Sequence, residues 1–198
     1  MRKLPQIAIL ALQGAFAEHR KMLESIGGVE TFEIRQSSDL ERKIHALILP
    51  GGESTVQGKL LRELGLFLPL QKKIAAGLPV LATCAGIILL AEKLENDPQT
   101  HFATLPVSIR RNAYGRQLSS FYTAGEFGDL SAIPMPFIRA PQIIRCGENV
   151  QILSEYDHLP TAVKFRNQLA MTFHPEITDS DQIHRFFLKN MVLPAIKN

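Results

Sequence analysis

Cysteine is scarce in this sequence, with only Cys84 and Cys146 among 198 residues. Structural disulfides are typical of secreted domains, and no other feature of the chain indicates secretion. Two cysteines are also too few for a cysteine-rich zinc site. We therefore expect two free thiols, and we expect neither a bound metal nor a cofactor elsewhere in the chain.

Long hydrophobic runs are also lacking. The longest apolar stretch, residues 78–91, is interrupted by Pro79, Thr83 and Gly86, and it is too short and too broken to span a bilayer. The apolar run near the N-terminus ends at Gln13-Gly14 without the small-residue cleavage site of a signal peptide. We therefore expect a cytoplasmic protein without a membrane segment.

Charge of one sign is not in large excess, because the formal net charge is only +3. Proteins that bind nucleic acid usually concentrate basic residues in a stripe, so a nucleic-acid partner is not expected. Hydrophobic residues make up 45% and charged residues 21%, which is ordinary for a globular protein and too apolar for a disordered one. The length fits one domain over residues 1–198.

The first half of the chain alternates apolar runs with helical patterns. Residues 6–12 are almost continuously apolar, as expected of a parallel strand buried on both faces. A helical pattern follows over 15–26 and ends at Gly27-Gly28. The further predicted elements are strands at 29–34, 45–50 and 79–83, a helical turn at 37–39, and helices at 53–76, broken near Gly65, and at 85–94. This alternation predicts an α/β fold with a doubly wound, mostly parallel sheet.

The second half changes to short strands and closes with a helix. The predicted strands cover residues 107–111, 117–127, 137–144, 150–155, 161–165 and 168–173. Their short connections indicate antiparallel additions to the parallel core. Residues 179–192 have the pattern of an amphipathic helix, with one apolar face formed by Ile183, Phe186, Phe187 and Met191.

Cys84 lies between a predicted strand and a predicted helix, within Ala82-Thr83-Cys84-Ala85-Gly86. A strand-to-helix turn is the elbow that presents the nucleophile in many hydrolases, and small neighbours suit a tight turn. A position at a helix N-terminus also favours the reactive thiolate. A buried core cysteine is the alternative, and the turn alone does not decide between the two.

His174 and Glu176 follow the last predicted strand, on either side of Pro175. Residues two apart on an extended chain point the same way, and a carboxylate beside an imidazole fixes its tautomer and stabilises its cation. Pro175 suits a strand exit because it cannot donate to a ladder. A His-Pro-Glu turn on the surface is the alternative, and the better one for this segment taken alone.

Gly51-Gly52-Glu53-Ser54 ends a predicted strand and opens a predicted helix. Glycines allow close backbone approach, and free N–H groups there can bind an anion. A phosphate site is one alternative, although the Gly-Lys-Ser/Thr ending of a Walker A loop is missing. Since ligands gather at the carboxyl edge of open α/β sheets, we favour an oxyanion hole or substrate clamp beside Cys84.

The remaining histidines and Cys146 lack such a context. His45 begins a strand, and Cys146 follows one without an elbow, so we interpret it as a core or rim thiol. Four histidines without a partner at ligand spacing are interpreted as structural or surface groups: His19, His101, His158 and His184.

Together, Pro50-Gly51-Gly52, the Cys84 elbow and His174-Pro175-Glu176 resemble the triad (class I) glutamine amidotransferases. Within that family the chain resembles the glutaminase subunits of pyridoxal 5′-phosphate synthases over nearly its whole length. The stretches that carry the resemblance are 12–15 (LQGA), 49–55 (LPGGEST), 83–86 (TCAG), 111–117 (RNAYGRQ), 137–141 (FIRAP) and 173–176 (FHPE). Stretches 111–117 and 137–141 distinguish these subunits from other glutaminases.

The resemblance implies a flavodoxin-like fold and a role for each matching residue. Cys84 would be the nucleophile, His174 the general base and then acid, and Glu176 the carboxylate that orients it. The residues that would bind glutamine are Gly51, Gly52, Glu53, Arg111, Ile138 and Arg139. The backbone N–H groups of Gly52 and Ala85 would form the oxyanion hole.

Two positions depart from the family's pattern. Glutaminase elbows usually carry glycine two residues before the cysteine, and here that residue is Ala82. If the position needs a positive φ, alanine would cost about 1 kcal/mol or more, although its small size should let the turn survive. Ala113-Tyr114 replaces the Ser-Phe often found in that stretch, which is a mild change.

The resemblance also implies a partner. Ammonia released from L-glutamine would pass to a separate (β/α)₈-barrel synthase subunit, which condenses it with a pentose phosphate and a triose phosphate, and activity would be weak until that subunit docks. Two other functions stay open, namely another hydrolase on this scaffold, such as a γ-glutamyl peptidase or another synthase's glutaminase, and a binding module that has lost the chemistry. Stretches 111–117 and 137–141 argue against the first, and the complete triad argues against the second.

Overall fold

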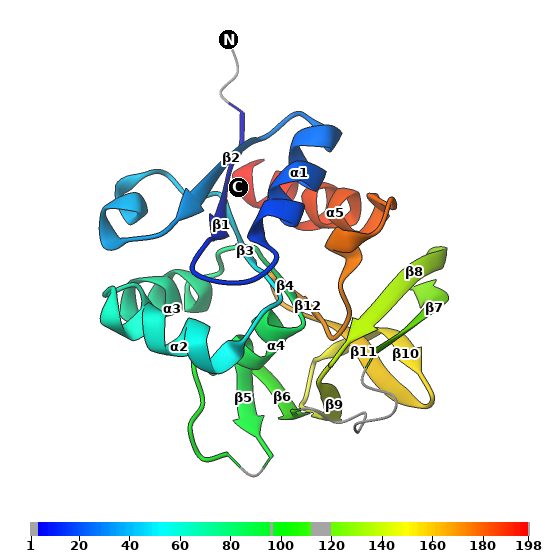
Figure 1. Cartoon of the computed structure of the whole chain (residues 1–198). Helices are drawn as coiled ribbons and strands as arrows, with labels where there is room; N and C mark the ends of the chain where they lie inside the picture. The colour runs from blue at the N-terminus through cyan, green and yellow to red at the C-terminus, as the bar shows by residue number, and fades with distance from the viewer. Residues whose placement is uncertain (1–3, 96, 112–119, 198) are drawn as a thin grey trace.

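The computed structural model describes residues 4–95, 97–111 and 120–197. Its centre is a seven-stranded sheet in the order β10-β11-β12-β4-β3-β1-β2 (Figure 1). Strands β12, β4, β3, β1 and β2 are parallel, and β11 and β10 extend one edge through antiparallel pairs. The bounds are β1 (Gln6–Leu10), β2 (Glu30–Ile34), β3 (Ala46–Leu49), β4 (Val80–Thr83), β10 (Gln151–Tyr156), β11 (Leu159–Phe165) and β12 (Gln168–Met171). The predicted fold class is confirmed.

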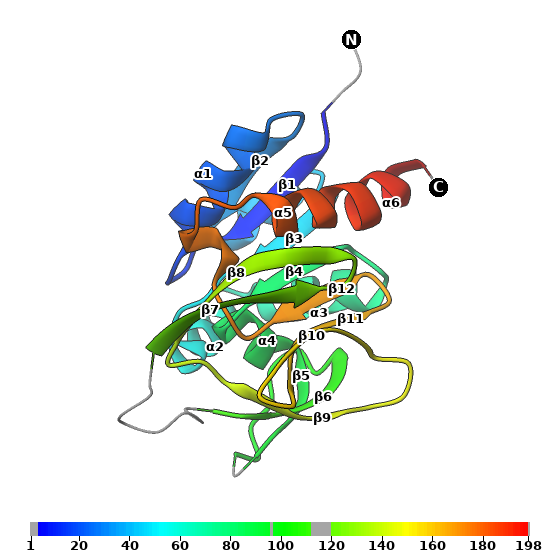
Figure 2. The same ribbon diagram turned by 90° about the vertical axis from the view of Figure 1, so that its right-hand side faces the viewer.

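Helices cover both faces of this sheet (Figures 1 and 2). One face carries α1 (Phe16–Ile26) and α5 (Gln182–Phe187), which continues through a π-helical turn (Leu188–Val192) into α6 (Leu193–Lys197). The other face carries α2 (Ser54–Glu63), α3 (Phe67–Ala75) and α4 (Ala85–Leu90), and a 3₁₀ turn (Ser37–Glu41) follows β2. Gly65, with φ of 68°, separates α2 from α3 where the sequence predicted a break.

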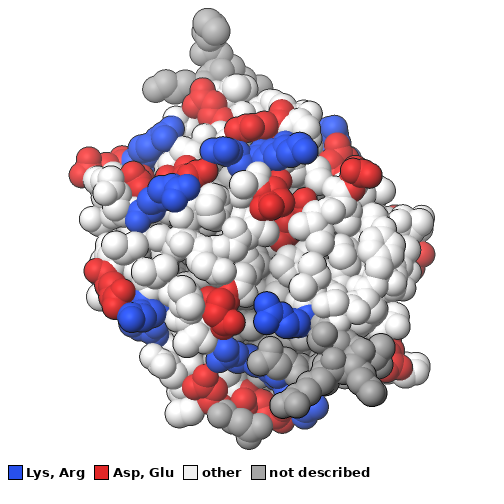
Figure 3. All heavy atoms as spheres, in the orientation of Figure 1, with Lys and Arg blue, Asp and Glu red and all other residues white. Residues whose placement is uncertain are grey.

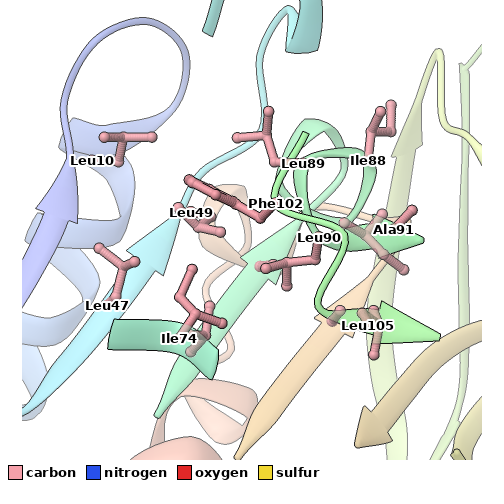
Figure 4. Close-up of a cluster of buried hydrophobic side chains, with 14 of the residues drawn as sticks. Leu10, Leu47, Leu49, Ile74, Ile88, Leu89, Leu90, Ala91, Phe102 and Leu105 are labelled. Carbon is pink, nitrogen blue, oxygen red and sulfur yellow. The ribbon is translucent and has the colours of Figure 1, made fainter. Parts of the chain in front are cut away.

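Alternate side chains of the parallel strands enter two separate cores. Leu47 and Leu49 of β3 face the core under α2, α3 and α4, whereas Ala46 and Ile48 face the core under α1 and α5. Figure 4 shows the first of these cores, with Leu47 and Leu49 beside Ile74 of α3. Burial on both faces is the reason why these strands are continuously apolar in sequence.

Two smaller sheets lie beside the central one. Strands β5 (Ala91–Leu94), β6 (Leu105–Arg110) and β9 (Gln142–Cys146) form the first, and the hairpin of β7 (Ser120–Phe127) and β8 (Leu130–Ile138) forms the second. The hairpin packs on the same core as α1 and α5. Among the described residues, β10 and β11 are the antiparallel strands that extend the central sheet, as predicted. The strand predicted over 168–173 was wrongly expected to be antiparallel, because β12 pairs parallel with β4 inside that sheet. The strands predicted over 107–111, 117–127 and 137–144 belong to the separate sheets.

Several predicted boundaries are wrong. The helix predicted over 85–94 ends at Leu90, because the chain extends at Ala91 and β5 pairs with β6. The strand predicted over 137–144 is two strands, because the left-handed φ of 43° at Arg139 ends β8 and turns the chain toward β9. Residues 130–136 of β8 were not predicted as a strand. The closing helix begins at Gln182 rather than at residue 179, and its last turns extend to Lys197.

Some expectations fall outside the described residues, namely those on 112–119, which include Ala113 and Tyr114. Within the described part, every helix is too short or too polar to cross a membrane. Among those same residues, no group of three or more His, Cys, Asp or Glu side chains is placed to hold a metal ion. Cys84 and Cys146 are free thiols, as predicted, and Cys146 is half-buried at the end of β9.

Candidate active site

Cys84 occupies the predicted turn between β4 and α4, with φ of 47° and ψ of −102°. A positive φ is strained for a residue with a side chain and costs on the order of 1–3 kcal/mol. The turn brings α4 very close to β3, because a Cβ atom at Gly86 would lie 2.1 Å from the backbone oxygen of Leu49. The strand-to-helix elbow is therefore present, and it presents a largely buried thiol.

Ala82 does not strain this elbow. It lies inside β4, paired with Leu49 of β3 and Ala170 of β12. The positive φ falls on Cys84 instead. Because alanine is compatible with ordinary strand geometry, the exchange of glycine for alanine brings no backbone penalty at this position.

His174 and Glu176 follow β12, the strand that pairs with β4. The Nδ1 atom of His174 lies 2.7 Å from Oε1 of Glu176. The two side chains meet through a 3₁₀ turn (Pro175–Ile177) rather than along the extended chain that the sequence predicted. Glu176 is only 4% exposed, so the alternative of a surface His-Pro-Glu turn is wrong.

Burial and charge act in opposite directions on this pair. Burial lowers the pKa of His174, but interactions with the Cys84 and Glu176 side chains outweigh burial and raise that pKa to about 10. Burial raises the pKa of the Glu176 carboxyl, but the electrostatic influence of His19 and the hydrogen bond with His174 outweigh it and lower that pKa. The site therefore favours an imidazolium beside a carboxylate.

A pocket opens in front of Cys84 and His174. It is lined by Gln13, Gly52, Glu53, Ser54, Cys84, Ile88, Arg111, Ile138, Arg139, Pro141 and His174. Most residues predicted for catalysis or glutamine binding are thus brought together in one cavity. Three of them lie behind its surface: Glu176 is bonded to His174, Ala85 is the buried residue after Cys84, and Gly51 backs the imidazole, where a Cβ atom would lie 2.2 Å from Cε1.

The glycine loop, Gly51-Gly52-Glu53-Ser54, forms hydrogen bonds with residues on two sides. The Gly51 N–H group donates to Thr83 Oγ1 at 3.0 Å, and the Gly51 carbonyl accepts from the Ala15 N–H group at 3.0 Å. The Gln13 side-chain carbonyl accepts from the Glu53 N–H group at 2.6 Å. The loops that follow β1, β3 and β4 are therefore tied together around the pocket.

Charges of both signs meet at the pocket edge. The Arg111 guanidinium lies 3.3 Å from Glu53 Oε1 and 3.5 Å from Asp97 Oδ2, and it donates to Thr55 Oγ1 at 2.9 Å. These contacts fix Arg111 across the start of α2. A zwitterionic ligand would find both a carboxylate and a guanidinium there.

The end of β8 closes the pocket on the other side. The Cys84 thiol lies 3.9 Å from the carbonyl oxygen of Ile138 and can donate to it. Arg139 follows in the left-handed conformation and also lines the pocket. The unusual backbone at Arg139 therefore brings Ile138 and Arg139 to Cys84.

Other residues at or behind the pocket were not predicted as site residues. Gln13 lines the pocket, and its position just after a buried strand could have indicated this. Thr83 is buried and bonds both the Gly51 N–H group and Glu176 Oε1. His19 and His184 were interpreted as structural or surface groups, and the structure shows that both are buried, with His19 Nδ1 2.9 Å from His184 Nε2. No local pattern could have paired residues so far apart in sequence.

The chain is similar to known proteins over most of its length. A relative from Desulfitobacterium hafniense (strain DSM 10664 / DCB-2), named pyridoxal 5′-phosphate synthase subunit PdxT, is 55% identical over 186 residues, which cover 94% of this chain and 93% of the relative. A protein of the same name from Streptococcus pneumoniae (strain CGSP14) is 48% identical over 187 residues, which cover 93% and 96%.

Solved structures show the same fold. The crystal structure of a glutamine amidotransferase superposes with a TM-score of 0.87 and 40% identity, covering 92% of this chain and 97% of that one. A putative GMP synthase protein from Thermoplasma acidophilum shares the fold with a TM-score of 0.67 and 17% identity, covering 100% and 96%. Residues 9–193 match the SNO glutamine amidotransferase family, and the chain therefore belongs to that family.

Proposed function

We propose that this chain is the glutaminase subunit of a pyridoxal 5′-phosphate synthase, which hydrolyses L-glutamine to L-glutamate and ammonia for vitamin B6 synthesis. The observation that carries the proposal is the pocket in which Cys84 and the His174–Glu176 pair face Glu53 and Arg111. Family membership and relatives that are named as subunits of that synthase support the same function.

Cys84, His174 and Glu176 act as the catalytic triad in this proposal. Before substrate attack, His174 has taken the thiol proton, in keeping with its raised pKa, and the Cys84 sulfur then attacks the side-chain amide carbon of glutamine. The imidazolium then protonates the departing nitrogen, so that ammonia leaves and a γ-glutamyl thioester remains. Water, deprotonated by His174, cleaves the thioester to glutamate, and the sulfur recovers its proton. Glu176 keeps Nδ1 of His174 protonated and stabilises the cation.

The tetrahedral intermediate needs donors for its oxyanion. The backbone N–H groups of Gly52 and Ala85 are the proposed donors, because Gly52 lines the pocket and Ala85 directly follows the nucleophile. Loss of one such donor typically costs about 3–4 kcal/mol of transition-state stabilisation. The bonds that hold Gly51 to Thr83 and Ala15 would keep the first donor in place.

Substrate binding is assigned to the charged edge of the pocket. Glutamine carries an ammonium and a carboxylate on its α-carbon, and Glu53, Arg111 and Arg139 offer complementary charges. Gly51, Gly52 and Ile138 contribute backbone contacts in this proposal.

Ammonia becomes protonated in water and then loses its nucleophilicity, so a closed route to a synthase is required. The proposed partner is a separate (β/α)₈-barrel subunit, which is expected to raise a weak basal activity when it docks. The reaction is expected to take place in the cytoplasm, as the sequence predicts.

The test is release of ammonia from L-glutamine by the wild type and by Cys84→Ala, each with and without a pyridoxal 5′-phosphate synthase barrel subunit. Activity that requires Cys84 and rises with the barrel subunit supports the whole proposal. Activity that requires Cys84 but does not change with the barrel subunit would support the glutaminase chemistry and contradict the proposed partner. Without activity that depends on Cys84 under either condition, the chain is a binding module.

A further inference from the structure

Two fully buried histidines lie directly behind the His174–Glu176 pair, where the proposed mechanism does not use them. Nε2 of His19 lies 3.1 Å from Thr83 Oγ1 and 3.6 Å from Glu176 Oε2, and Nδ1 of His19 lies 2.9 Å from Nε2 of His184. His19 comes from α1 and His184 from α5, whereas Thr83 is the residue before Cys84. These side chains therefore join two helices to the elbow and to Glu176.

The Thr83 hydroxyl determines the direction of the hydrogen bonds. A hydroxyl group has one proton to donate and two lone pairs to accept with. The N–H group of Gly51 can only donate to Thr83 Oγ1, and a Glu176 carboxylate 3.3 Å away can only accept from it. The second lone pair of Oγ1 is then left for His19, so Nε2 of His19 carries a proton and donates.

The tautomers of both histidines follow from this assignment. Burial lowers the pKa of His19 and lowers the pKa of His184 to about 3, so both rings are neutral near pH 7. With Nε2 of His19 protonated, its Nδ1 atom must accept, and Nε2 of His184 must donate. The bare Nδ1 of His184 is then the atom without a partner, as is observed. An unpaired acceptor on a neutral ring is a modest cost.

Every donor in this series points toward Glu176: His184 donates to His19, His19 to Thr83, and Thr83 to Oε1 of the carboxylate. The other carboxylate oxygen, Oε2, is buried without a hydrogen bond, and Nε2 of His19 lies 3.6 Å from it. A buried carboxylate needs such donors to stay ionised.

We propose that His19 and Thr83, supported by His184, are positioning residues that keep Glu176 ionised and directed toward His174. Because Thr83 Oγ1 also accepts from the Gly51 N–H group, Thr83 links the position of Glu176 to that of the glycine loop. The proposal rests on the triad roles proposed above. None of these three residues lines the pocket, so they act on the reaction only through Glu176 and Gly51.

The groups that face this cluster set its electrostatics. Glu176 is faced by His19 and His174, and His184 is influenced by His19 and Glu176. His19 is influenced by Glu176, His174 and the carboxylate of Glu18 on its own helix. Removal of a donor leaves the Glu176 charge less compensated, so its pKa rises and it takes up a proton at a higher pH.

The decisive experiment compares Thr83→Val with Thr83→Ser in the complex with the synthase barrel subunit, measuring kcat and KM for glutamine between pH 5 and 9. Valine keeps the shape of threonine and removes the hydroxyl, whereas serine keeps the hydroxyl. We expect Thr83→Val to lower kcat by about tenfold with little change in KM and to move the acid limb of the pH profile upward. Thr83→Ser should stay close to the wild type.

A second pair tests His19 in the same way. Glutamine at position 19 places an N–H donor near the position of Nε2, whereas leucine has none. We therefore expect His19→Leu to lower kcat and His19→Gln to retain much of the wild-type kcat. His45→Leu is the matched control, because it removes a histidine that accepts from the Gln6 N–H group at the opposite end of the sheet. It should leave the pH profile unchanged even if stability falls.

A Thr83→Val variant with the kcat and pH profile of Thr83→Ser would overturn the inference, and this pair decides if His19→Leu does not fold. The pKa of His174, followed by NMR in the Thr83 variants, needs no turnover and should be lower in Thr83→Val. A wild type without Cys84-dependent ammonia release but with this shift would remove the proposed function and keep the inference. An active wild type whose His174 pKa is the same in both Thr83 variants would keep the proposed function and remove the inference.

Discussion

At the residue scale, position 51 has no room for a side chain, and the reason is a neighbouring side chain rather than the turn or the φ of Gly51. The hydrogen atom on its α-carbon faces the His174 ring, and a Cβ atom there would overlap Cε1 and Nδ1. The absence of a side chain at Gly51 therefore determines where the imidazole sits.

We expect Gly51→Ala to displace the His174 ring and to lower kcat/KM for glutamine by roughly 10²-fold, because a shift of about 1 Å of a catalytic group can cost that much. Gly125→Ala is the matched control, because a Cβ atom at Gly125 meets Met135 only at ordinary contact distance. Ammonia release and thermal unfolding should be measured for both. Equal activity of the two variants would contradict the role of Gly51.

The backbone at Cys84 leads to a second prediction at this scale. The left-handed φ of 47° is strained for alanine and accessible to glycine. We expect Cys84→Gly to have a free energy of unfolding about 1 kcal/mol higher than Cys84→Ala, although both lack the thiol. Urea denaturation of the two variants provides the measurement. If alanine is equally or more stable, the elbow stores no backbone strain.

At the element scale, the contact between α1 and α5 depends on histidines that must stay neutral. Burial lowers the pKa of His184 from 6.5 to about 3, and it lowers the pKa of His19 as well. Below pH 6.5 the unfolded chain takes up protons that the folded protein resists. The stabilising contribution of these groups is therefore present above pH 6.5 and is lost as the pH falls toward 3.

We predict that His184→Gln reduces the acid sensitivity of folding, because glutamine keeps an N–H donor toward His19 and does not titrate. Between pH 7 and pH 5 the wild type should lose about 2 kcal/mol more unfolding free energy than the variant, at about 1.4 kcal/mol per pH unit below 6.5. Urea titrations at the two pH values give this difference. The same loss in both proteins would show that His184 is not the titrating group.

Element boundaries also show what local sequence can predict. The parallel strands were predicted because burial on both faces leaves a continuous apolar run in sequence. The short strand β5 was predicted as helix, since Ala91–Leu94 takes its extended form from pairing with β6. The break at Arg139 was missed because a left-handed arginine carries no glycine signal.

At the scale of the whole molecule, the site lies where strands from both halves of the chain end together. β3 and β4 come from the first half and β12 from the second, and their adjacency places Gly51, Cys84 and His174 at one edge. The face shown in Figure 3 carries Lys and Arg interspersed with Asp and Glu, in keeping with the small net charge. Shape and the arrangement of individual charges, rather than one extended basic or acidic field, are therefore what this face offers to a partner.

The sequence by itself determined the fold class, the Cys84 elbow, the glycine loop and the nearness of His174 to Glu176. Each depends on residues close together along the chain, whose pattern follows from burial or from tight turns. Only the tertiary structure decided that His19 and His184 meet, that Thr83 joins Gly51 to Glu176, and that Ile138 lies beside Cys84. These contacts depend on strand order and on how the helices seat against the sheet, because they join side chains as many as 165 positions apart.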